Sequence, residues 1–221
     1  IILELHTPEM WYIEPFVGGG NMIDKISDDL APLKYGLDVN NYVIEALIDI
    51  RDHLDLLPKN NKEFTEEDYK NLRKDNSYRH KGFAGFAYSY SGKWLGGWCR
   101  DSEGKRDYVA ESFRNAAKQS PNLKNVKLHT KSVFDLQTLS VKSTIYCDPP
   151  YRDTTKYSGS FDHERFYDWC RQKAKEGHNV YISEYWMPDD FECVWAKEVN
   201  SSLTKDTGSK KATERLFKIT P

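Results

Sequence analysis

A carboxylate, two prolines and an aromatic ring follow an apolar run in IYCDPPYR, residues 145–152. Prolines exclude helix and remove two backbone donors, so residues 148–151 are predicted to form a stiffened loop at the end of a strand. Such a loop holds the Asp148 carboxylate, two free carbonyl oxygens and the Tyr151 ring in a fixed relation. Because carboxylate and carbonyl oxygens are hydrogen-bond acceptors, this loop is the first candidate for chemistry. The alternative is a rigid turn without a chemical role.

A glycine run follows the first predicted strand, in EPFVGGGN at residues 14–21. Glycines let the chain turn sharply and bring backbone N–H groups close to a ligand at the start of a helix. The spacing is neither that of the phosphate loop G-x-x-x-x-G-K-[ST] nor that of G-x-G-x-x-G. The run is therefore either a ligand-binding loop or a tight turn.

Asp38 falls at the predicted end of the second strand, 24 residues after Glu14. An acidic side chain at such a place can bind both hydroxyls of a ribose. The alternative is that Asp38 is the N-cap of the next helix, since Val39-Asn40-Asn41 follows it. The glycine run favours the first interpretation.

The elements that must position these residues follow from the hydrophobic periodicity. Strands are predicted at residues 11–16, 34–39, 126–130, 144–147, 179–185, 192–199 and 214–220, and helices at 22–30, 40–57, 107–119 and 166–177. Strands that alternate with helices of crossover length indicate an α/β fold whose parallel sheet is covered on both faces. The last strands have no helix between them, which indicates an antiparallel hairpin at the edge. Ligands of such sheets bind beyond the carboxyl ends of the strands.

Residues 58–106 are polar, rich in Gly, Tyr and Trp, and without sustained periodicity. We interpret them as an insertion that divides an α/β domain into residues 1–57 and 107–221. The part from 79 to 106 carries six basic and two acidic side chains, interleaved with aromatic residues. Basic side chains contact phosphates, and aromatic ones wedge between or stack on bases, although about half of these aromatic residues are expected to form a small core. The candidates for DNA contact are Arg79, Lys93, Arg100 and Arg106.

Composition narrows the range of partners and cofactors. The formal net charge of −2 gives no global argument for a polyanionic partner, so any nucleic-acid contact must come from a local basic patch. The four cysteines lie far apart without a C-x-x-C pair and the six histidines form no cluster, so we expect no metal site. No apolar run approaches the roughly 18 residues of a membrane span, and a reducing cytoplasm is the simplest setting.

The segments EPFVGGG, DVN and DPPY, in this order, resemble the Dam-like, D12-type adenine-N6 methyltransferases of DNA. GFAGFAYSYSGKWLGGW at 82–98, YISEY at 181–185 and ERLF at 214–217 are similar to further segments of phage and bacterial members. The resemblance implies a Rossmann-like fold with an inserted target-recognition subdomain, and S-adenosylmethionine as the methyl donor. Carried over by position, the donor site would comprise Glu14, Pro15, Phe16, Gly18, Gly20, Asp38, Ser132, Val133 and Asp148. Phe16 would lie near the methionine end of the donor, and Asp38 would hold the ribose hydroxyls.

The resemblance also implies that residues 148–151 activate an exocyclic amine, whose lone pair is delocalised into the ring of the base. The Asp148 carboxylate would accept one hydrogen and the Pro149 carbonyl the other, after which the amine attacks the sulfonium methyl. Tyr151 would offer a ring face to a target base that has left the duplex stack. Lys156 and Tyr157 would line the pocket for that base, or belong to a surface loop.

Two features depart from the family. Its members carry a basic-aromatic, glycine-containing segment before the first strand, and nothing of that kind precedes Ile1, so we expect the chain to be truncated there. Ser132 stands where members often have an Asp near the adenine of the donor.

From these residues we predict a site-specific adenine-N6 methyltransferase that acts on double-stranded DNA in the cytoplasm of a bacterium or phage-infected host. It would protect DNA against restriction, alone or paired with a cognate restriction endonuclease. The alternatives are methylation of adenine N6 in RNA, methylation of cytosine N4 in DNA, and a DNA-binding relative without activity. The prediction requires residues 14–20 and 148–151 to lie at one rim of a sheet, with a nucleoside-sized hollow between them.

Overall fold

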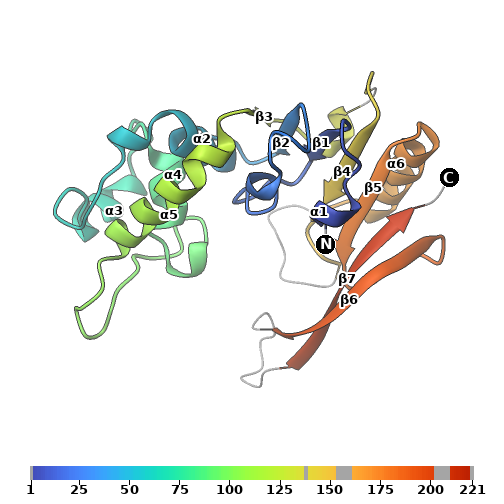
Figure 1. The fold of residues 1–221 in the computed structure, drawn as a ribbon. Helices are drawn as coiled ribbons and strands as arrows, with labels where there is room; N and C mark the ends of the chain where they lie inside the picture. The colour runs from blue at the N-terminus through green and yellow to red at the C-terminus, as the bar shows by residue number, and fades with distance from the viewer. Residues whose placement is uncertain (1, 137–138, 153–160, 202–209, 220–221) are drawn as a thin grey trace.

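The computed structural model describes residues 2–136, 139–152, 161–201 and 210–219, and Figure 1 shows a twisted sheet beside a group of helices. The strands of these residues are β1 (Trp11–Glu14), β2 (Lys34–Asp38), β3 (Val126–Thr130), β4 (Ser143–Cys147), β5 (Asn179–Glu184), β6 (Phe191–Ser201) and β7 (Lys210–Ile219). They form one sheet in the order β3-β2-β1-β4-β5-β7-β6. Strands β1 to β5 run parallel, and β7 is antiparallel to both β5 and β6. The predicted Rossmann-like α/β fold with an antiparallel edge hairpin is therefore confirmed.

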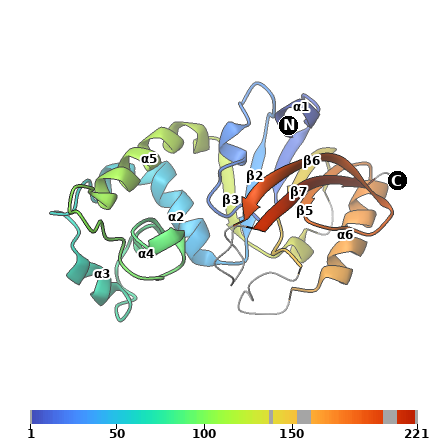
Figure 2. The ribbon, with the colours of Figure 1, turned by 90° about the horizontal axis from the view of Figure 1, so that it is seen from below.

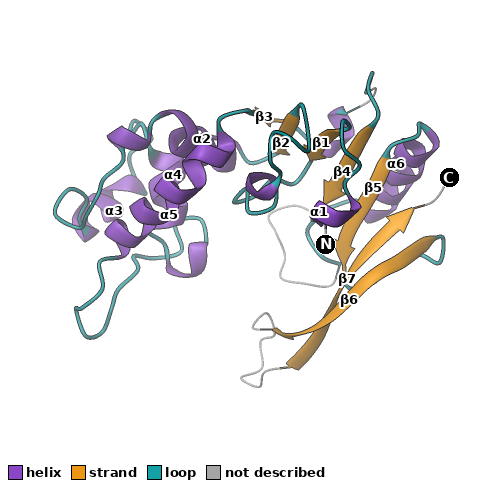
Figure 3. Cartoon of the chain, viewed as in Figure 1, coloured by secondary structure: helices purple, strands orange, loops and turns teal. Residues whose placement is uncertain are grey.

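The order of the strands reverses between β1 and β4. From β1 the chain extends the sheet through β2 to β3, and it then returns to the other side of β1 to form β4 and β5, as the strand arrows of Figure 3 show. Open α/β sheets bind their ligands at such a reversal, outside the carboxyl ends of the strands. This fold therefore makes the ends of β1 and β4 the place to look for a site.

Side chains of the sheet alternate between two cores, as the two-residue period of a strand requires. Tyr12 and Tyr146 face one core, which includes residues of the helices between β2 and β3, whereas Ile13 and Ile145 face the other. All five residues of β4 are buried. Burial on both faces explains why apolar residues follow one another without alternation at residues 145–147.

The helices lie in two groups. The first comprises α2 (Asn41–Asp52), α3 (Glu66–Leu72), α4 (Lys81–Ala87) and α5 (Tyr108–Leu123), which we call the helical lobe, and the others are α1 (Ile2–Leu5) and α6 (His163–Lys175). Helix α2 packs on β2, β3, α4 and α5, while α6 packs on β5 and β7. Figures 1 and 2 both show the helical lobe on one side of the sheet and α6 on the other. Among the described helices, none has the length and hydropathy that a bilayer crossing requires.

Two glycines allow α4 to lie close to its neighbours in the helical lobe. A Cβ on Gly82 would come within 2.5 Å of the Tyr42 carbonyl oxygen, and one on Gly85 within 2.3 Å of the Trp94 ring. The Trp94 ring in turn stacks on that of Tyr42, with centroids 4.1 Å apart. Tyr90, by contrast, is 68 % exposed. The small aromatic core expected within residues 79–106 is thus present, and it is continuous with α2.

The helix predicted over residues 22–30 is wrong. The structure has only the short 3₁₀ turn η1 (Ile23–Lys25), after which Ile26 is extended at φ −77° and ψ 110°. The N–H of Ile23, at the start of this turn, donates to the Glu14 carboxylate. The first N–H groups of a helix have no intrahelical partner in any case, so this bond fixes the start of η1, while the extended backbone at Ile26 ends the helical segment after one turn.

Other helix boundaries shift by a few residues. Helix α2 ends at Asp52 instead of continuing to 57, α5 runs through Pro121 to Leu123, and α6 begins at His163 because Asp162 provides its N-cap.

Candidate active site

The glycine loop, residues 14–20, and the DPPY loop, residues 148–151, start from the same rim of the sheet. Strands β1 and β4 are parallel neighbours in which Ile13 lies opposite Ile145. The first loop leaves the carboxyl end of β1, and the second leaves the carboxyl end of β4. Burial raises the pKa of the Glu14 carboxyl well above its usual range, and the nearby charge of Asp148 raises it further. The expected juxtaposition of the two loops is therefore present.

The glycine loop contains two residues with left-handed backbone geometry, Gly18 at φ +46° and Gly20 at φ +71°. This geometry favours glycine at both positions. A Cβ on Gly20 would also lie 3.1 Å from Cδ2 of Leu47, whereas a Cβ on Gly18 would meet no atom within 4 Å. Packing therefore restricts Gly20, and Gly18 leaves open space in which a ligand can approach the backbone.

Glu14 shapes the glycine loop from inside the protein. Its side chain is buried, and its Oε2 accepts a hydrogen bond of 3.0 Å from the N–H of Ile23. Pro15 is buried beside it, so neither side chain offers a surface to a ligand. The predicted donor-site role of these two residues is consistent with support of the loop and not with direct contact.

Asp38 connects the end of β2 to the glycine loop. Its Oδ2 accepts a 3.3 Å hydrogen bond from the N–H of Gly18, and its Oδ1 accepts one of 2.9 Å from the N–H of Asn40. Burial raises the pKa of Asp38, and these bonds act in the opposite direction. The N-cap of α2 is Asn40, whose Oδ1 accepts from the N–H of Tyr42 at 3.0 Å. The alternative assignment of Asp38 as the helix cap is therefore excluded.

Ser132 and Val133 follow β3 and lie near the end of β2. The N–H of Lys131 donates to the carbonyl of Asp38 at 2.9 Å, which ties the two strand ends together. Ser132 is the N-cap of the 3₁₀ turn η4 (Val133–Asp135), where its Oγ accepts from the N–H of Phe134 at 3.3 Å. Val133 is buried. Ser132 is thus engaged within its own turn, and Val133 belongs to the core.

An aromatic wall joins the glycine loop to η4. The half-buried ring of Phe16 meets Phe161 edge-to-face at a centroid distance of 5.6 Å, and Phe161 stacks on Phe134 at 6.2 Å. The guanidinium of Arg165 lies over Phe134, 4.1 Å from the ring centroid. Phe16 therefore has an apolar setting, and its role at the methionine end of the donor stays a prediction.

In the DPPY loop, Pro149 is buried while Asp148 keeps an exposed surface. Partial burial of the Asp148 carboxyl nevertheless raises its pKa. A hydrogen bond from the Tyr151 hydroxyl lowers the same pKa, by a smaller amount. The Tyr151 hydroxyl lies 2.8 Å from Oγ of Ser183 on β5. The loop thus presents the Asp148 carboxylate as an acceptor at the rim of the sheet. The Tyr151 hydroxyl contacts this carboxylate, and Ser183 contacts Tyr151.

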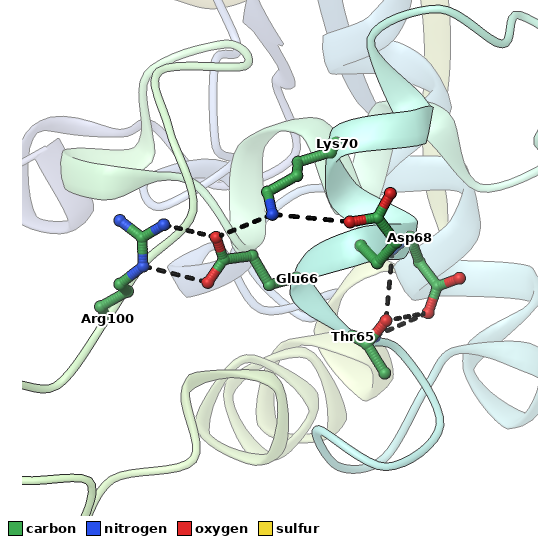
Figure 4. Close-up of polar contacts among 6 residues, drawn as sticks. Thr65, Glu66, Asp68, Lys70 and Arg100 are labelled. Carbon is green, nitrogen blue, oxygen red and sulfur yellow. Dashed lines mark hydrogen bonds and ion pairs between the residues drawn. The ribbon is translucent and has the colours of Figure 1, made fainter.

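The four candidate DNA contacts differ in availability. The side chains of Arg79 and Lys93 are exposed, and neither forms a hydrogen bond or ion pair with another described residue. Arg100 instead pairs with Glu66 of α3 through two hydrogen bonds, one of them 3.0 Å from Nε to Oε2. Figure 4 shows Lys70 on the other side of the same carboxylate, 3.5 Å from Oε1.

Arg106 is also engaged. Its Nε and Nη2 donate to the Glu111 carboxylate at 2.9 and 2.6 Å, and its guanidinium lies 4.6 Å from the centroid of the Tyr108 ring. Arg100 and Arg106 would have to release a carboxylate before contacting a phosphate, whereas Arg79 and Lys93 would not.

Two cavities lie away from the glycine and DPPY loops. One of about 380 Å³ is lined by Phe134 and Trp169 among others, and one of about 310 Å³ lies over the sheet at Trp11 and Tyr35. No residue of the two loops lines either of them, so neither is the hollow expected between the loops. No three His, Cys, Asp or Glu side chains in the described parts of the chain are grouped so as to hold a metal ion.

Some predicted residues lie beyond the described structure, and some site residues escaped prediction. Lys156 and Tyr157 lie outside the described residues. Sequence reasoning missed Val39, which is 70 % exposed beside Asp38, and Ser183 and Glu184, which contact the DPPY loop and the residue after it. The signal for Ser183 and Glu184 was the YISEY segment, which continues past the end of a strand that a parallel sheet places next to β4.

Comparisons with known proteins give little further information. No family model matches the chain, and no curated protein matches it in sequence. A proposed methylase from Haemophilus influenzae has 11 % sequence identity and a TM-score of 0.40, over 100 % of this chain and 92 % of that one. SMU.472, a proposed methyltransferase complexed with SAH, has 12 % identity and a TM-score of 0.36, over 99 % of this chain and 50 % of that one. With likeness this low, the residues of the chain itself must support the functional argument.

Proposed function

We propose that this chain is a site-specific DNA methyltransferase that transfers a methyl group from S-adenosylmethionine to the exocyclic N6 amine of a flipped adenine in double-stranded DNA. The observation that carries the proposal is the position of Asp148 beside the glycine loop, where the strand order reverses. A nucleoside-containing donor bound at that loop would lie next to a carboxylate acceptor. The resemblance to D12-type enzymes supplies the choice of DNA adenine.

The residues at the end of β2 fit the nucleoside part of S-adenosylmethionine. Each oxygen of Asp38 accepts one backbone N–H, and a carboxylate has about four lone-pair sites, so acceptors remain for the two ribose hydroxyls. Gly18 leaves open space beside the backbone, and the exposed Val39 offers an apolar contact for the base. When bound here, S-adenosylmethionine supplies an activated methyl group on sulfur.

Asp148 and Pro149 fit the acceptor side of the reaction. An ionised Asp148 accepts one hydrogen of the amine, and the Pro149 carbonyl oxygen can accept the other. Both bonds favour the geometry in which the nitrogen lone pair points away from the ring of the base. Positive charge develops on the nitrogen during attack, and the carboxylate stabilises it without rearranging. Asp148 can then hold the proton that the methylated amine loses.

The helical lobe supplies the basic surface that the proposal needs. Arg79 and Lys93 are exposed there and available for phosphate contacts, which position a protein on a duplex without reading its sequence. Because the acceptor chemistry suits any exocyclic amine, adenine N6 in RNA and cytosine N4 in DNA remain the alternative substrates.

Product analysis tests the proposal. The protein is incubated with S-adenosylmethionine labelled in its methyl group and with duplex DNA of mixed sequence or with single-stranded RNA, and the product is digested to nucleosides. We expect the label in N6-methyl-2′-deoxyadenosine. Label only in ribonucleosides or in N4-methylcytosine would identify an alternative substrate, and no label anywhere would contradict the function. The Asp148→Ala variant should lose turnover while it retains DNA binding.

A further inference from the structure

Residues 183–185, at and just after the end of β5, contact the DPPY loop and the residue after it at three successive positions. Ser183 Oγ lies 2.8 Å from the Tyr151 hydroxyl, and Glu184 Oε2 accepts from the N–H of Arg152 at 3.1 Å. The Tyr185 ring meets the Tyr151 ring edge-on at a centroid distance of 4.9 Å. β4 and β5 are parallel neighbours, so the end of one strand supports the loop that leaves the other.

The hydroxyl groups form a chain whose direction follows from donor and acceptor inventory. The Tyr151 hydroxyl hydrogen-bonds the Asp148 carboxylate, which, when ionised, can only accept. Tyr151 must therefore donate its single proton to Asp148. The oxygen of Tyr151 is then the acceptor in its contact with Ser183, and Ser183 is the donor. The orientation of the Asp148 carboxylate thus depends, through Tyr151, on a serine of another strand.

Glu184 fixes the backbone immediately after the DPPY loop. The residue is 2 % exposed, and each of its carboxylate oxygens accepts one backbone N–H, from Tyr185 at 2.8 Å and from Arg152 at 3.1 Å. Burial of this carboxylate costs free energy and raises its pKa, and the two bonds offset part of that cost. A glutamine could accept only one of them and would direct its NH₂ group at the other N–H. The two bonds therefore require a carboxylate.

We propose that Ser183 and Glu184 are positioning residues for methyl transfer: they hold Asp148 in its productive orientation through Tyr151 and through the backbone of Arg152. The inference rests on the proposed function and adds two residues that do not themselves touch donor or base. A displacement of the acceptor by a fraction of an ångström lowers the rate of transfer more than it lowers affinity. The effect should therefore appear in kcat and not in donor binding.

A double-mutant cycle tests the hydroxyl chain. Ser183→Ala and Tyr151→Phe should each lower kcat by about 10-fold or more, and the double variant should be no slower than the slower single variant, because both changes break the same chain. The dissociation constant for S-adenosylmethionine, measured by calorimetry, should change by less than about 2-fold. Multiplicative effects of the two changes, or a loss of donor affinity that accounts for the loss of rate, would overturn the inference.

Glu184→Gln tests the backbone contact with a readout that needs no substrate. The quantity measured is hydrogen exchange of the Arg152 amide in the full chain, without donor or DNA. Because Pro149 and Pro150 have no N–H, few other amides of residues 148–152 exchange alongside it. We expect slow exchange in the wild type, exchange faster by about 10-fold or more in Glu184→Gln, and no change in the control Glu192→Gln, an exposed glutamate of β6. Equal exchange in wild type and Glu184→Gln would overturn the role of Glu184. If Glu184→Gln fails to fold, the Ser183 cycle still decides the role of the hydroxyl chain.

Different results would contradict the proposed function and the positioning role of Ser183 and Glu184. A wild type that exchanges slowly at Arg152 but transfers no methyl group to any duplex contradicts the proposed function, and the inference with it. A wild type that methylates DNA while Ser183→Ala and Glu184→Gln retain full kcat contradicts the inference alone.

Discussion

The backbone amide of Gly18 donates a hydrogen bond to Oδ2 of Asp38 across 3.3 Å, although the two residues are 20 positions apart in the chain. A second amide, from Asn40, donates to Oδ1 at 2.9 Å. The glycine loop and the end of β2 are therefore one unit, and the backbone orients the carboxylate before any ligand arrives.

Replacing Asp38 should weaken binding of the methyl donor. Hydrogen bonds to a charged acceptor contribute about 1.5–3 kcal/mol, so Asp38→Ala should raise the dissociation constant for S-adenosylmethionine by about 10- to 100-fold. Calorimetric titration measures this directly. Asp29→Ala, which changes an exposed aspartate before β2, is the matched control and should bind like the wild type. Equal affinities for Asp38→Ala and the control would remove Asp38 from the donor site.

Gly19 and Gly20 should respond differently to alanine. Gly20→Ala forces a left-handed residue to carry a Cβ that lies 3.1 Å from Leu47, so we expect a loss of about 1–2 kcal/mol in the free energy of unfolding. Gly19→Ala lacks the unfavourable backbone angle, and its Cβ meets only the side chain of Asn21, so its effect should stay within about 0.5 kcal/mol. Urea denaturation of both variants checks the order. A larger loss for Gly19→Ala would show that the loop has another conformation.

The strands and the two loops could be predicted because their signals are local. Every residue of β4 is buried, residues 145–147 of the strand form a short apolar run, and the two prolines after Asp148 mark its end. That the loops after β1 and β4 lie side by side cannot be read from spacing, since more than 100 residues separate Glu14 from Asp148. It followed from the rule that parallel α/β sheets gather the carboxyl ends of their strands at one rim.

What could not be predicted depends on partners that are distant in sequence. Arg100 pairs with Glu66, 34 residues away, so its basic charge is partly neutralised in a manner that composition does not show. The helical spacing of residues 22–30 also failed, because the backbone becomes extended at Ile26 after a single 3₁₀ turn. Ser183 reaches Tyr151 because the sheet places β5 beside β4, and the sequence alone does not give that pairing.

The rate of methyl transfer should fall at acid pH. The proposed role needs an ionised Asp148, whose pKa is raised by burial, so kcat should decrease on acidification with a midpoint above the usual aspartate value of about 3.9. The hydrogen bond from Tyr151 lowers this pKa, so Tyr151→Phe should move the midpoint to higher pH. A pH profile of kcat at saturating donor and DNA measures both. A profile that is flat through the acid range would contradict the role of Asp148.

Glu14→Gln should stabilise the protein at neutral and alkaline pH. Burial raises the pKa of Glu14 in the folded state above its unfolded value, so the stability that this group contributes is full below the unfolded pKa and is lost as pH rises through the folded pKa. Glutamine carries no charge, and its carbonyl can still accept from the N–H of Ile23. We expect a gain of at least about 1 kcal/mol in the free energy of unfolding at pH 8, since a tenfold difference in proton affinity corresponds to about 1.4 kcal/mol.

The control for this change is again Glu192→Gln, which should leave stability unchanged at both pH values. Denaturation of Glu14→Gln near pH 4, where the wild-type carboxyl is protonated in the folded state, should show no gain. A gain of equal size at pH 4 and pH 8 would mean that the effect comes from packing and not from charge.

DNA binding should depend more on Arg79 and Lys93 than on Arg106. The first two side chains are exposed without an ion pair to a described residue, so Arg79→Ala and Lys93→Ala should each weaken binding to any duplex and reduce the slope of log K against log salt by about 1. Arg106→Ala should have a smaller effect, because that guanidinium already pairs with the Glu111 carboxylate. Titration of a labelled duplex at several salt concentrations measures the slopes, with Lys175→Ala at the end of α6 as a control that should not change them. Unchanged slopes for both Arg79→Ala and Lys93→Ala would show that the helical lobe does not bind the DNA backbone through these residues.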